Sequence, residues 1–499
     1  MPQRYVIVAI TAVAALWMYI DRVCFATLSE PMKVELLLPL APEPDEPPGA
    51  FQRVVRWFLS DALSDDDLAA AKKMKRKSLG DGAPAGAGEL TDAEVTAAKK
   101  RKWADTRMSF ALGAFFLTYA LFQIPMGTLA DRYGARRVLA LSIAAWSLVT
   151  MATGFVLGFA ALLGIRLLLG VTEAGAYPAA AGLVKRWAPP SRRGLCSSVV
   201  ALGGRIGGVI APWLTALLAV GLVGAALVEW AVTPDAVPPE PGETPTNWRG
   251  VFVVYGACGL AVAALFWLVV RDRPPGTEAE ADTGRSAAPA ELTLVQRIGL
   301  LARTRNMWCF GGVQFGVNMG WAFIVTLLPT YLKQEFGTPV ETVGPMQTVA
   351  LAIGACGMIC GGAFTDLARA RLGPKYGRSV PIVVALSGGA LVFFVVPTLP
   401  TAWAAVVALG VMAFLVDMHN PSLWSFAQDV GGKNVGAALG WGNMWGNLGA
   451  AVSPVLLNAV RQSAGWNAAF LCCGVAFTCA AVCGLVLDAT KPVDEPPLA

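Results

Sequence analysis

The sequence predicts an all-helical membrane protein with twelve transmembrane helices in two pseudo-symmetric six-helix bundles. The first observation is composition: of 499 residues, 55% are hydrophobic and 15% are charged. Soluble domains carry about 25% charged residues, so this chain lacks the polar surface that a soluble protein of its size needs. The second observation is a series of long apolar runs, and the third is a set of landmarks that recur in the two halves.

The apolar runs have the length of membrane spans. A hydrocarbon core about 30 Å thick needs roughly 20 residues in a helix that rises 1.5 Å per residue. Backbone polar groups must be paired within lipid, so each run is predicted to be a helix. Six runs lie near 5–28, 106–128, 138–158, 160–184, 195–219 and 250–270. Six more lie near 307–332, 344–365, 380–398, 402–426, 436–459 and 467–488.

The distribution of Lys and Arg predicts the orientation of these spans. If the N-terminus is cytoplasmic, the cytoplasmic loops and tails hold 20 basic residues, and the short outer loops hold 3, namely Arg249, Lys333 and Arg461. Basic residues accumulate on the cytoplasmic side of membrane proteins. We therefore expect both termini in the cytoplasm, with the protein integral to the lipid bilayer.

A long outer loop is predicted over residues 30–104, with 12 basic and 13 acidic side chains. Loops this long largely escape the charge rule, and their balanced charge argues against binding to nucleic acid. Within the loop, apolar residues of 51–63 follow helical spacing. Thr91 and Glu94 have the spacing of a capping box, which predicts a helix that continues into the second span.

The two halves of the chain resemble each other in the same order. Gly127–Asp131 recurs at Gly362–Asp366, and Arg193–Pro212 recurs at Val435–Pro454. Doubled membrane folds of this kind bind substrate between the repeats near the midplane and work by alternating access. The expected organisation is an N-terminal bundle over 1–270, a cytoplasmic linker over 271–306 and a C-terminal bundle over 307–499. The glycines of 203–208 favour close helix contacts.

Gly127–Arg137 resembles the loop signature of the major facilitator superfamily, with a weaker echo at Asp366–Arg378. Tyr19–Arg22, the stretch from Arg166 to Ala180, and Leu328–Leu332 are similar to the anion:cation symporter family, which carries hexuronates, galactonate, glucarate and sialate. The resemblance covers nearly the whole chain apart from an insertion at about 41–100. It implies the major facilitator fold, and we expect a monomer in a bacterial inner membrane.

Charged residues within the spans mark a candidate site. Each costs about 2.5–3.5 kcal/mol at the bilayer centre. Three arginines and two carboxylates lie in the N-terminal half, and Asp417 and His419 lie in the tenth span. The excess of arginine predicts an anionic ligand, since a guanidinium binds a carboxylate through two parallel bonds. The alternative is a buried ion-pair network that only stabilises the bundle. The three arginines are Arg22, Arg166 and Arg205, and the two carboxylates are Asp21 and Glu173.

Counting helical rise from the span ends places Asp21, Arg22 and Arg166 in the outer half, with Glu173 two turns further in. Near the midplane it places Arg205 and four polar residues that can line the same cavity, namely Tyr119, Asn318, Asn443 and Asn447. The family resemblance implies that Arg22 binds the substrate carboxylate and that Tyr119 contacts substrate. It also implies that Asp21 and Glu173 couple transport to protons, with Arg166 as their partner. Sodium coupling remains possible. Arg205 departs from the family, and two interpretations stay open: a second contact to the anion, or a pair with Glu173.

Other conspicuous residues have plainer interpretations. His419 is expected to be a structural residue on the cytoplasmic side. Trp321, Trp441 and Trp445 are either packing residues or surfaces on which a sugar stacks. An inner gate that favours the outward-open state is expected from the charge clusters at the cytoplasmic loops, namely Asp131, Arg132, Arg136, Arg137, Asp366, Arg369 and Arg371.

The predicted function is uptake of a small organic anion, a sugar acid such as a hexuronate or aldonate, driven by protons. The substrate residues expected from these arguments are Arg22, Tyr119, Arg205, Asn318, Trp321, Asn443 and Asn447. Alternatives are a proton-driven exporter of another molecule and a transporter-like sensor. The sequence holds no phosphate-binding Gly-rich loop and no HExxH motif, and nothing in it predicts an enzyme, a cofactor or a metal.

Overall fold

The computed structural model describes residues 3–41, 90–221, 246–274 and 292–493, and the regular structure in these ranges is helical. The first half contains α1 (Gln3–Thr27), α2 (Ser29–Leu36), α5 (Asp92–Tyr133), α6 (Ala135–Thr153), α7 (Phe159–Glu173), α8 (Ala176–Trp187), α9 (Arg193–Gly221) and α10 (Trp248–Val269). The second half contains α12 (Leu294–Arg303), α13 (Arg305–Ala322), α14 (Leu328–Phe336), α15 (Val340–Val395), α16 (Ala402–Val430) and α17 (Val435–Val486).

Ten helical stretches in the described ranges are long and apolar enough to cross a membrane. Two of them, α15 and α17, each contain two of the predicted spans. In both, the helices meet at a glycine with positive φ, Gly373 at 76° and Gly465 at 81°. L-residues with a side chain rarely adopt this conformation. The all-helical membrane fold is thus confirmed, and the count of twelve crossings stays a prediction.

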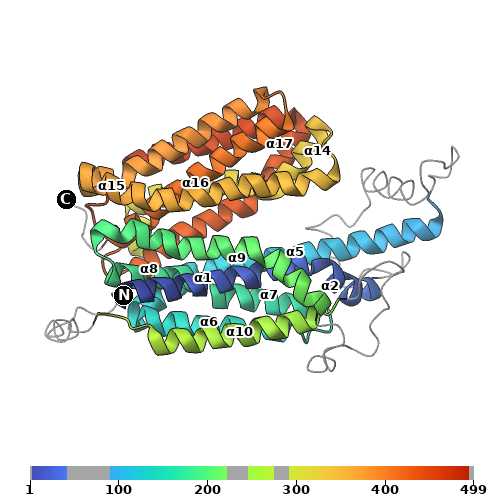
Figure 1. Ribbon diagram of the computed structural model, residues 1–499, viewed down its shortest axis with the longest axis horizontal. Coiled ribbons are helices and arrows are strands. Elements are labelled where there is room, and N and C mark those ends of the chain that lie inside the picture. The colour runs from blue at the N-terminus through green and yellow to red at the C-terminus, as the bar shows by residue number, and fades with distance from the viewer. Residues whose placement is uncertain (1–2, 42–89, 222–245, 275–291, 494–499) are drawn as a thin grey trace.

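The helices form two groups that lie side by side (Figure 1). The helices α14 to α17, yellow to red, run above the blue and green helices α1 to α10 in this view. The start of α1 and the final described residues lie near the same end: Tyr5 accepts a hydrogen bond from Arg192, and Val493 donates to Val430. We call this end of the molecule the terminal end. The bundle boundaries at 270 and 307 stay predictions, and the described part of the linker contains α12.

Glycine residues bring pairs of helices into backbone contact. A Cβ on Gly207 of α9 would lie 2.2 Å from the carbonyl oxygen of Leu16 in α1, so only glycine fits there. Its repeat counterpart, Gly449 of α17, approaches the carbonyl oxygen of Phe315 in α13 in the same way, at 2.4 Å. The predicted close contact around 203–208 is present, and the sequence repeat corresponds to a repeated helix pair.

The start of α5 lies within the predicted outer loop. Thr91 accepts a bond from the backbone of Glu94, whose carboxylate accepts from the backbone of Thr91, so the predicted capping box is confirmed. The helix then continues for 42 residues, and Figure 1 shows its first part projecting beyond the bundle. Lys33 of α2 forms an ion pair with Asp105 in this part of α5, with 2.5 Å between Nζ and Oδ1. The amphipathic stretch at 51–63 lies outside the described residues.

Candidate substrate-binding site

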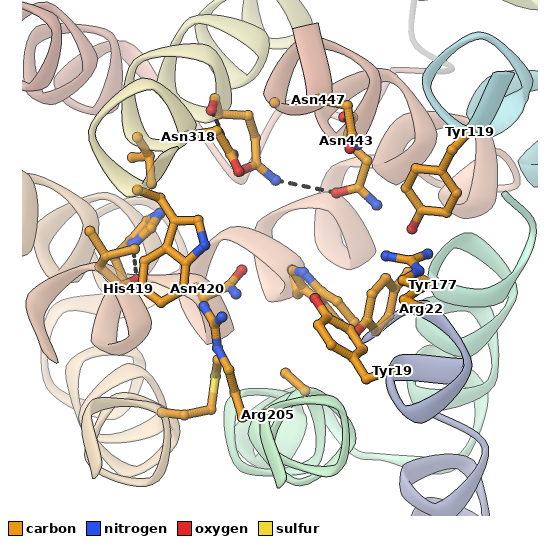
Figure 2. Close-up of a pocket in the computed structure, with 18 residues that line it drawn as sticks. Tyr19, Arg22, Tyr119, Tyr177, Arg205, Asn318, His419, Asn420, Asn443 and Asn447 are labelled. Carbon is orange, nitrogen blue, oxygen red and sulfur yellow. Dashed lines mark hydrogen bonds between the residues drawn. The ribbon is translucent and has the colours of Figure 1, made fainter. Parts of the chain in front are cut away.

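A cavity between the two groups of helices contains all seven predicted substrate residues (Figure 2). Helices α1, α5, α8 and α9 of the first half line one side, and α13, α15, α16 and α17 of the second half line the other. The predicted residues on its wall are Arg22, Tyr119, Arg205, Asn318, Trp321, Asn443 and Asn447. The wall also includes Tyr19, Tyr177, Gln314, His419, Asn420 and Trp424, which sequence reasoning did not assign to the site.

Arg22 enters the cavity from α1 with a buried carboxylate behind it. Its Nε donates to Glu173 Oε2 at 2.5 Å, while the guanidinium carbon lies 4.2 Å from the ring centre of Tyr119. The Arg22 side chain is 15% exposed, and the Glu173 side chain is fully buried. The Nη2 of Arg22 also donates to the sulfur of Met18, at 3.6 Å. The guanidinium nevertheless lies on the cavity wall, where an incoming carboxylate can reach it.

Arg205 repeats this arrangement from α9. Its Nη2 donates to Asp417 of α16, and its guanidinium lies 4.1 Å from the ring centre of Trp321. Here too the arginine is partly exposed, at 22%, and the carboxylate is buried, at 1%. The proposed pair between Arg205 and Glu173 is therefore wrong, because Glu173 is bonded to Arg22 instead. Sequence reasoning noted Asp417 within the membrane but gave it no role.

Asp21 and Arg166 lie deeper than the cavity wall. Asp21 is 1% exposed, and neither of its carboxyl oxygens has a hydrogen-bond partner among the described residues. Arg166 lies over two aromatic rings, 4.0 Å from the centre of Phe25 and 4.8 Å from that of Phe115. The expected ion pairs of Arg166 with Asp21 and Glu173 are thus absent from the described residues, and Arg166 is stabilised by cation–π contacts.

Side-chain amides form a connected part of the wall on the second half. Gln314 donates to Asn443 Oδ1 at 3.3 Å, and Asn443 donates across the halves to Gln123 of α5, also at 3.3 Å. Asn318 and Asn447 donate to backbone carbonyls one turn earlier in their own helices. Each amide carries both donors and acceptors, so this wall can donate hydrogen bonds to hydroxyl groups or accept hydrogen bonds from them.

The three tryptophans singled out in the sequence separate into two groups. Trp321 faces the cavity, whereas Trp441 and Trp445 pack against Trp308, with ring centres 5.3 and 5.5 Å away. Trp441 also donates to the carbonyl of Met307, so both are packing residues.

The structural part of the His419 prediction fits the geometry, but its position does not. The ring is buried and bonded through Nδ1 to the carbonyl of Val416 in its own helix. The residue lies on the cavity wall, next to Asn420 of the same helix, rather than toward the terminal end (Figure 2).

Two aspartates join the halves at the terminal end. Asp131, at the end of α5, accepts bonds from the backbone N–H groups of Gly436 and Ala437 in the first turn of α17, at 2.8 and 3.0 Å. Asp366 of α15 accepts from the corresponding groups of Gly194 and Leu195 in α9, at 2.9 and 3.0 Å. Each carboxylate satisfies unpaired donors at a helix start and meets the positive end of the helix dipole.

Backbones also touch at this junction. A Cβ on Gly127 of α5 would lie 2.2 Å from the carbonyl oxygen of Gly436, and one on Gly440 would lie 2.5 Å from that of Gln123. No side chain can fit between α5 and α17 at these points.

Of the predicted arginines, Arg369 lies near Asp366, three residues later on the same helix. The other arginines that complete the junction differ from those predicted. Arg193 bonds to Asp429 across the halves, and Arg378 donates to Asp429 at 2.8 Å. Arg297 of α12 donates to Asn434 at 2.7 Å. By contrast, two predicted gate arginines make their contacts within the first half: Arg136 donates to the carbonyl of Trp267, and Arg132 lies over the ring of Tyr133. Two others, Arg137 and Arg371, are exposed.

Comparison with known proteins extends these observations. The sequence profile described as Major Facilitator Superfamily matches residues 87–454. The chain is 27% identical to the "Probable sulfoacetate transporter" of Cupriavidus necator over 78% of this chain and 87% of the relative. It is 27% identical to the "Hexuronate transporter" of Bacillus subtilis, over 74% and 82%. It is 28% identical to a "Probable galactarate/D-glucarate transporter" of Escherichia coli, over 79% and 89%.

Solved structures share the fold. The fucose:proton symporter of Escherichia coli superimposes with a TM-score of 0.62 at 13% identity, covering 98% of this chain and all of that one. A human organic anion transporter gives 0.60 at 18% identity, covering 97% and all of that chain. With its helical membrane fold, its doubled sequence and a profile match over most of its length, the chain belongs to the Major Facilitator Superfamily, a family of transporters and not of enzymes.

Proposed function

We propose that the protein takes up a small organic anion, a sugar acid, by proton-coupled symport. The observation that carries this proposal is the pair formed by Arg22 and Glu173: the cation faces the cavity and the buried acid lies behind it. A substrate carboxylate that binds Arg22 competes with Glu173 for the same guanidinium. Glu173 then takes up a proton, because an unpaired buried carboxylate is strongly disfavoured. Binding of the anion and uptake of the proton are thus linked.

The nature of the wall and the relatives support the substrate class. The amides of Asn318, Asn443 and Asn447, together with Tyr119 and Trp321, suit the hydroxyl groups and apolar face of a sugar acid. The relatives transport, according to their names, sulfoacetate, hexuronates and galactarate or glucarate. All of these carry an acidic group that an arginine fork can bind.

The direction of transport follows from the proposed orientation. If the basic-rich terminal end is cytoplasmic in a bacterial inner membrane, Asp131 and Asp366 close the cytoplasmic side and form the inner gate. Release of substrate inward requires these bonds to break and the halves to rock, which is alternating access.

Uptake into proteoliposomes tests the proposal. The assay uses labelled hexuronate, galactonate, glucarate, galactarate and sulfoacetate with an imposed pH gradient, a sodium gradient, or neither. We expect accumulation of at least one acid with the pH gradient, its loss on adding a protonophore, and little uptake by Arg22→Gln. Arg461→Gln is the matched control, because Arg461 bonds to Asn458 and Gln334 outside the cavity. Uptake driven only by sodium would overturn the coupling, and no uptake of any acid would overturn the substrate class.

Export is a second candidate, since the chain is 27% identical to a "Quinolone resistance transporter" of Acinetobacter baumannii over 74% of its length. Proton-driven loss of a quinolone from preloaded vesicles, without uptake of any acid, would favour it.

A further inference from the structure

The cavity contains a second arginine–carboxylate pair built like the first. In both pairs the arginine is partly exposed, 15% for Arg22 and 22% for Arg205, and the acid is buried, 0% for Glu173 and 1% for Asp417. In both pairs the arginine occupies one carboxylate oxygen, and the other, Glu173 Oε1 or Asp417 Oδ2, is buried without a hydrogen-bond partner among the described residues. Two equivalent anion-binding groups therefore face one cavity.

The two arginines are placed to bind the two ends of one molecule. Arg22 projects from α1 and Arg205 from α9, at separate positions on the wall (Figure 2). Tyr19 also lines this cavity, with its ring centre 5.4 Å from the guanidinium carbon of Arg22. Trp321 lies under the Arg205 guanidinium, and the amides of Gln314 and Asn443 line the opposite wall. A chain with an acidic group at each end and hydroxyls between them fits this order of groups.

Charge balance connects this arrangement to protons. Each pair is neutral, so a dianion that enters the cavity adds two negative charges to a site within the membrane. Burying charge without compensation is expensive. One proton on each displaced carboxylate restores neutrality. Among the described residues, the titratable group bonded to Asp417 is Arg205. Tyr19 and Tyr177 line the same cavity, as does His419, which follows two residues later on α16 and is bonded to its own backbone.

We propose, as an extension of the proposed function, that the substrate is a two-headed acid, meaning one with an acidic group at each end, and that its ends bind Arg22 and Arg205. Asp417 then takes up a second proton, in addition to the one that Glu173 takes up. Each proton comes from solution on the side where substrate enters, forms an O–H bond on the displaced carboxylate, and leaves on the other side when the arginine pairs again. Asp417 thereby becomes a coupling residue of the second half.

Binding of matched acids tests the two-headed substrate. D-glucarate and D-gluconate differ only at one end, as do galactarate and galactonate, and sulfoacetate is compared with acetate. In titration calorimetry of the full-length protein, we expect the two-headed member of at least one pair to bind about 10- to 100-fold more tightly, as expected for a lost bond to a charged group. Arg205→Gln should abolish that preference and leave the one-headed acid unaffected, and Arg461→Gln should change neither.

Two results of this experiment overturn the inference: no two-headed acid binds more tightly than its partner, or the preference survives in Arg205→Gln. In either case, proton-driven uptake of a one-headed acid would leave the proposed function intact. If the wild-type protein binds and transports none of the acids, the proposed function fails as well.

Proton stoichiometry tests Asp417 directly. At zero membrane voltage, each coupled proton multiplies the accumulation of substrate by about tenfold per pH unit, the factor that 1.4 kcal/mol gives. With a gradient of about one pH unit, we expect about 100-fold accumulation of the two-headed acid in the wild type and about tenfold accumulation in Asp417→Asn. A variant that keeps the wild-type ratio overturns the role of Asp417.

Asp417→Asn leaves the Arg205 guanidinium without its carboxylate partner within the membrane, and the variant can misfold. The double variant Arg205→Gln/Asp417→Asn removes both charges, and it should transport a one-headed acid with one proton. If Asp417 only stabilises the fold, this variant will instead keep the wild-type stoichiometry with the two-headed acid.

Discussion

Removing the charge of Asp131 should open the terminal end of the protein. The carboxylate accepts two backbone bonds from the start of α17 and is only 5% exposed. Bonds to a charged acceptor each contribute about 1.5–3 kcal/mol, and a neutral bond contributes about 1 kcal/mol. A side-chain amide at this position would keep one acceptor oxygen and no charge, so Asp131→Asn should weaken the closed state by about 2–5 kcal/mol. That is at least about a 30-fold change in the ratio of closed to open.

Pulsed electron paramagnetic resonance measures this change. Spin labels at the exposed positions Arg137 and Arg371 lie on opposite halves near the junction, and in nanodiscs Asp131→Asn should shift their distance distribution toward larger values. Asp366→Asn should do so less, because Asp366 is 15% exposed. Asp272→Asn is the control: Asp272 bonds to Arg136 and Arg186 within the first half. An unchanged distribution in Asp131→Asn, or an equal shift in Asp272→Asn, would refute the reasoning.

Four further predictions concern the site, the packing and the insertion. Arg22→Lys should keep the melting temperature but lower substrate affinity about 10- to 100-fold in calorimetry, because a lysine ammonium cannot make the two parallel hydrogen bonds that a guanidinium makes with a carboxylate. Glu173→Gln should abolish proton-driven accumulation yet retain counterflow exchange, since the amide resembles the protonated acid; loss of both would make Glu173 structural. Gly207→Ala should destabilise the protein by about 1–3 kcal/mol, whereas Gly208→Ala, whose Cβ would lie no closer than 3.4 Å to Tyr19, should leave the melting temperature unchanged. Replacing 42–89 with a Gly/Ser linker should preserve folding and initial uptake rates, because α5 is held by its capping box and Lys33; a folded but inactive product would place the loop in the gate.

The cavity residues were predictable because depth along a helix is encoded in the sequence. Counting residues from the span ends brought Arg205 and the asparagines near the midplane and Arg22 somewhat further out, and in the structure all of them line one cavity. Counting gives depth but not the direction in which a side chain points. It therefore could not assign Glu173 to Arg22 or Asp417 to Arg205, since these pairings depend on how helices rotate and how the halves meet.

The junction was predictable only in its carboxylates. Asp131 and Asp366 occupy equivalent places in a repeated motif, and both bond to helix starts. Their nearby arginines were expected to join them, but the bridging cations are Arg193, Arg297 and Arg378. Charges in short loops have the same local pattern whether they face solvent or a partner, so only the packed structure distinguishes the two groups.

The backbone contact between Gly127 and Gly436 has a consequence for energy conservation. Protons move through proteins along chains of water, and water needs space between helices. Where α5 and α17 touch without side chains between them, the gap is too narrow for such a chain. If transport is coupled to protons as we propose, the closed junction excludes water at these contacts and so limits the leak of protons through the cavity while the halves are at rest.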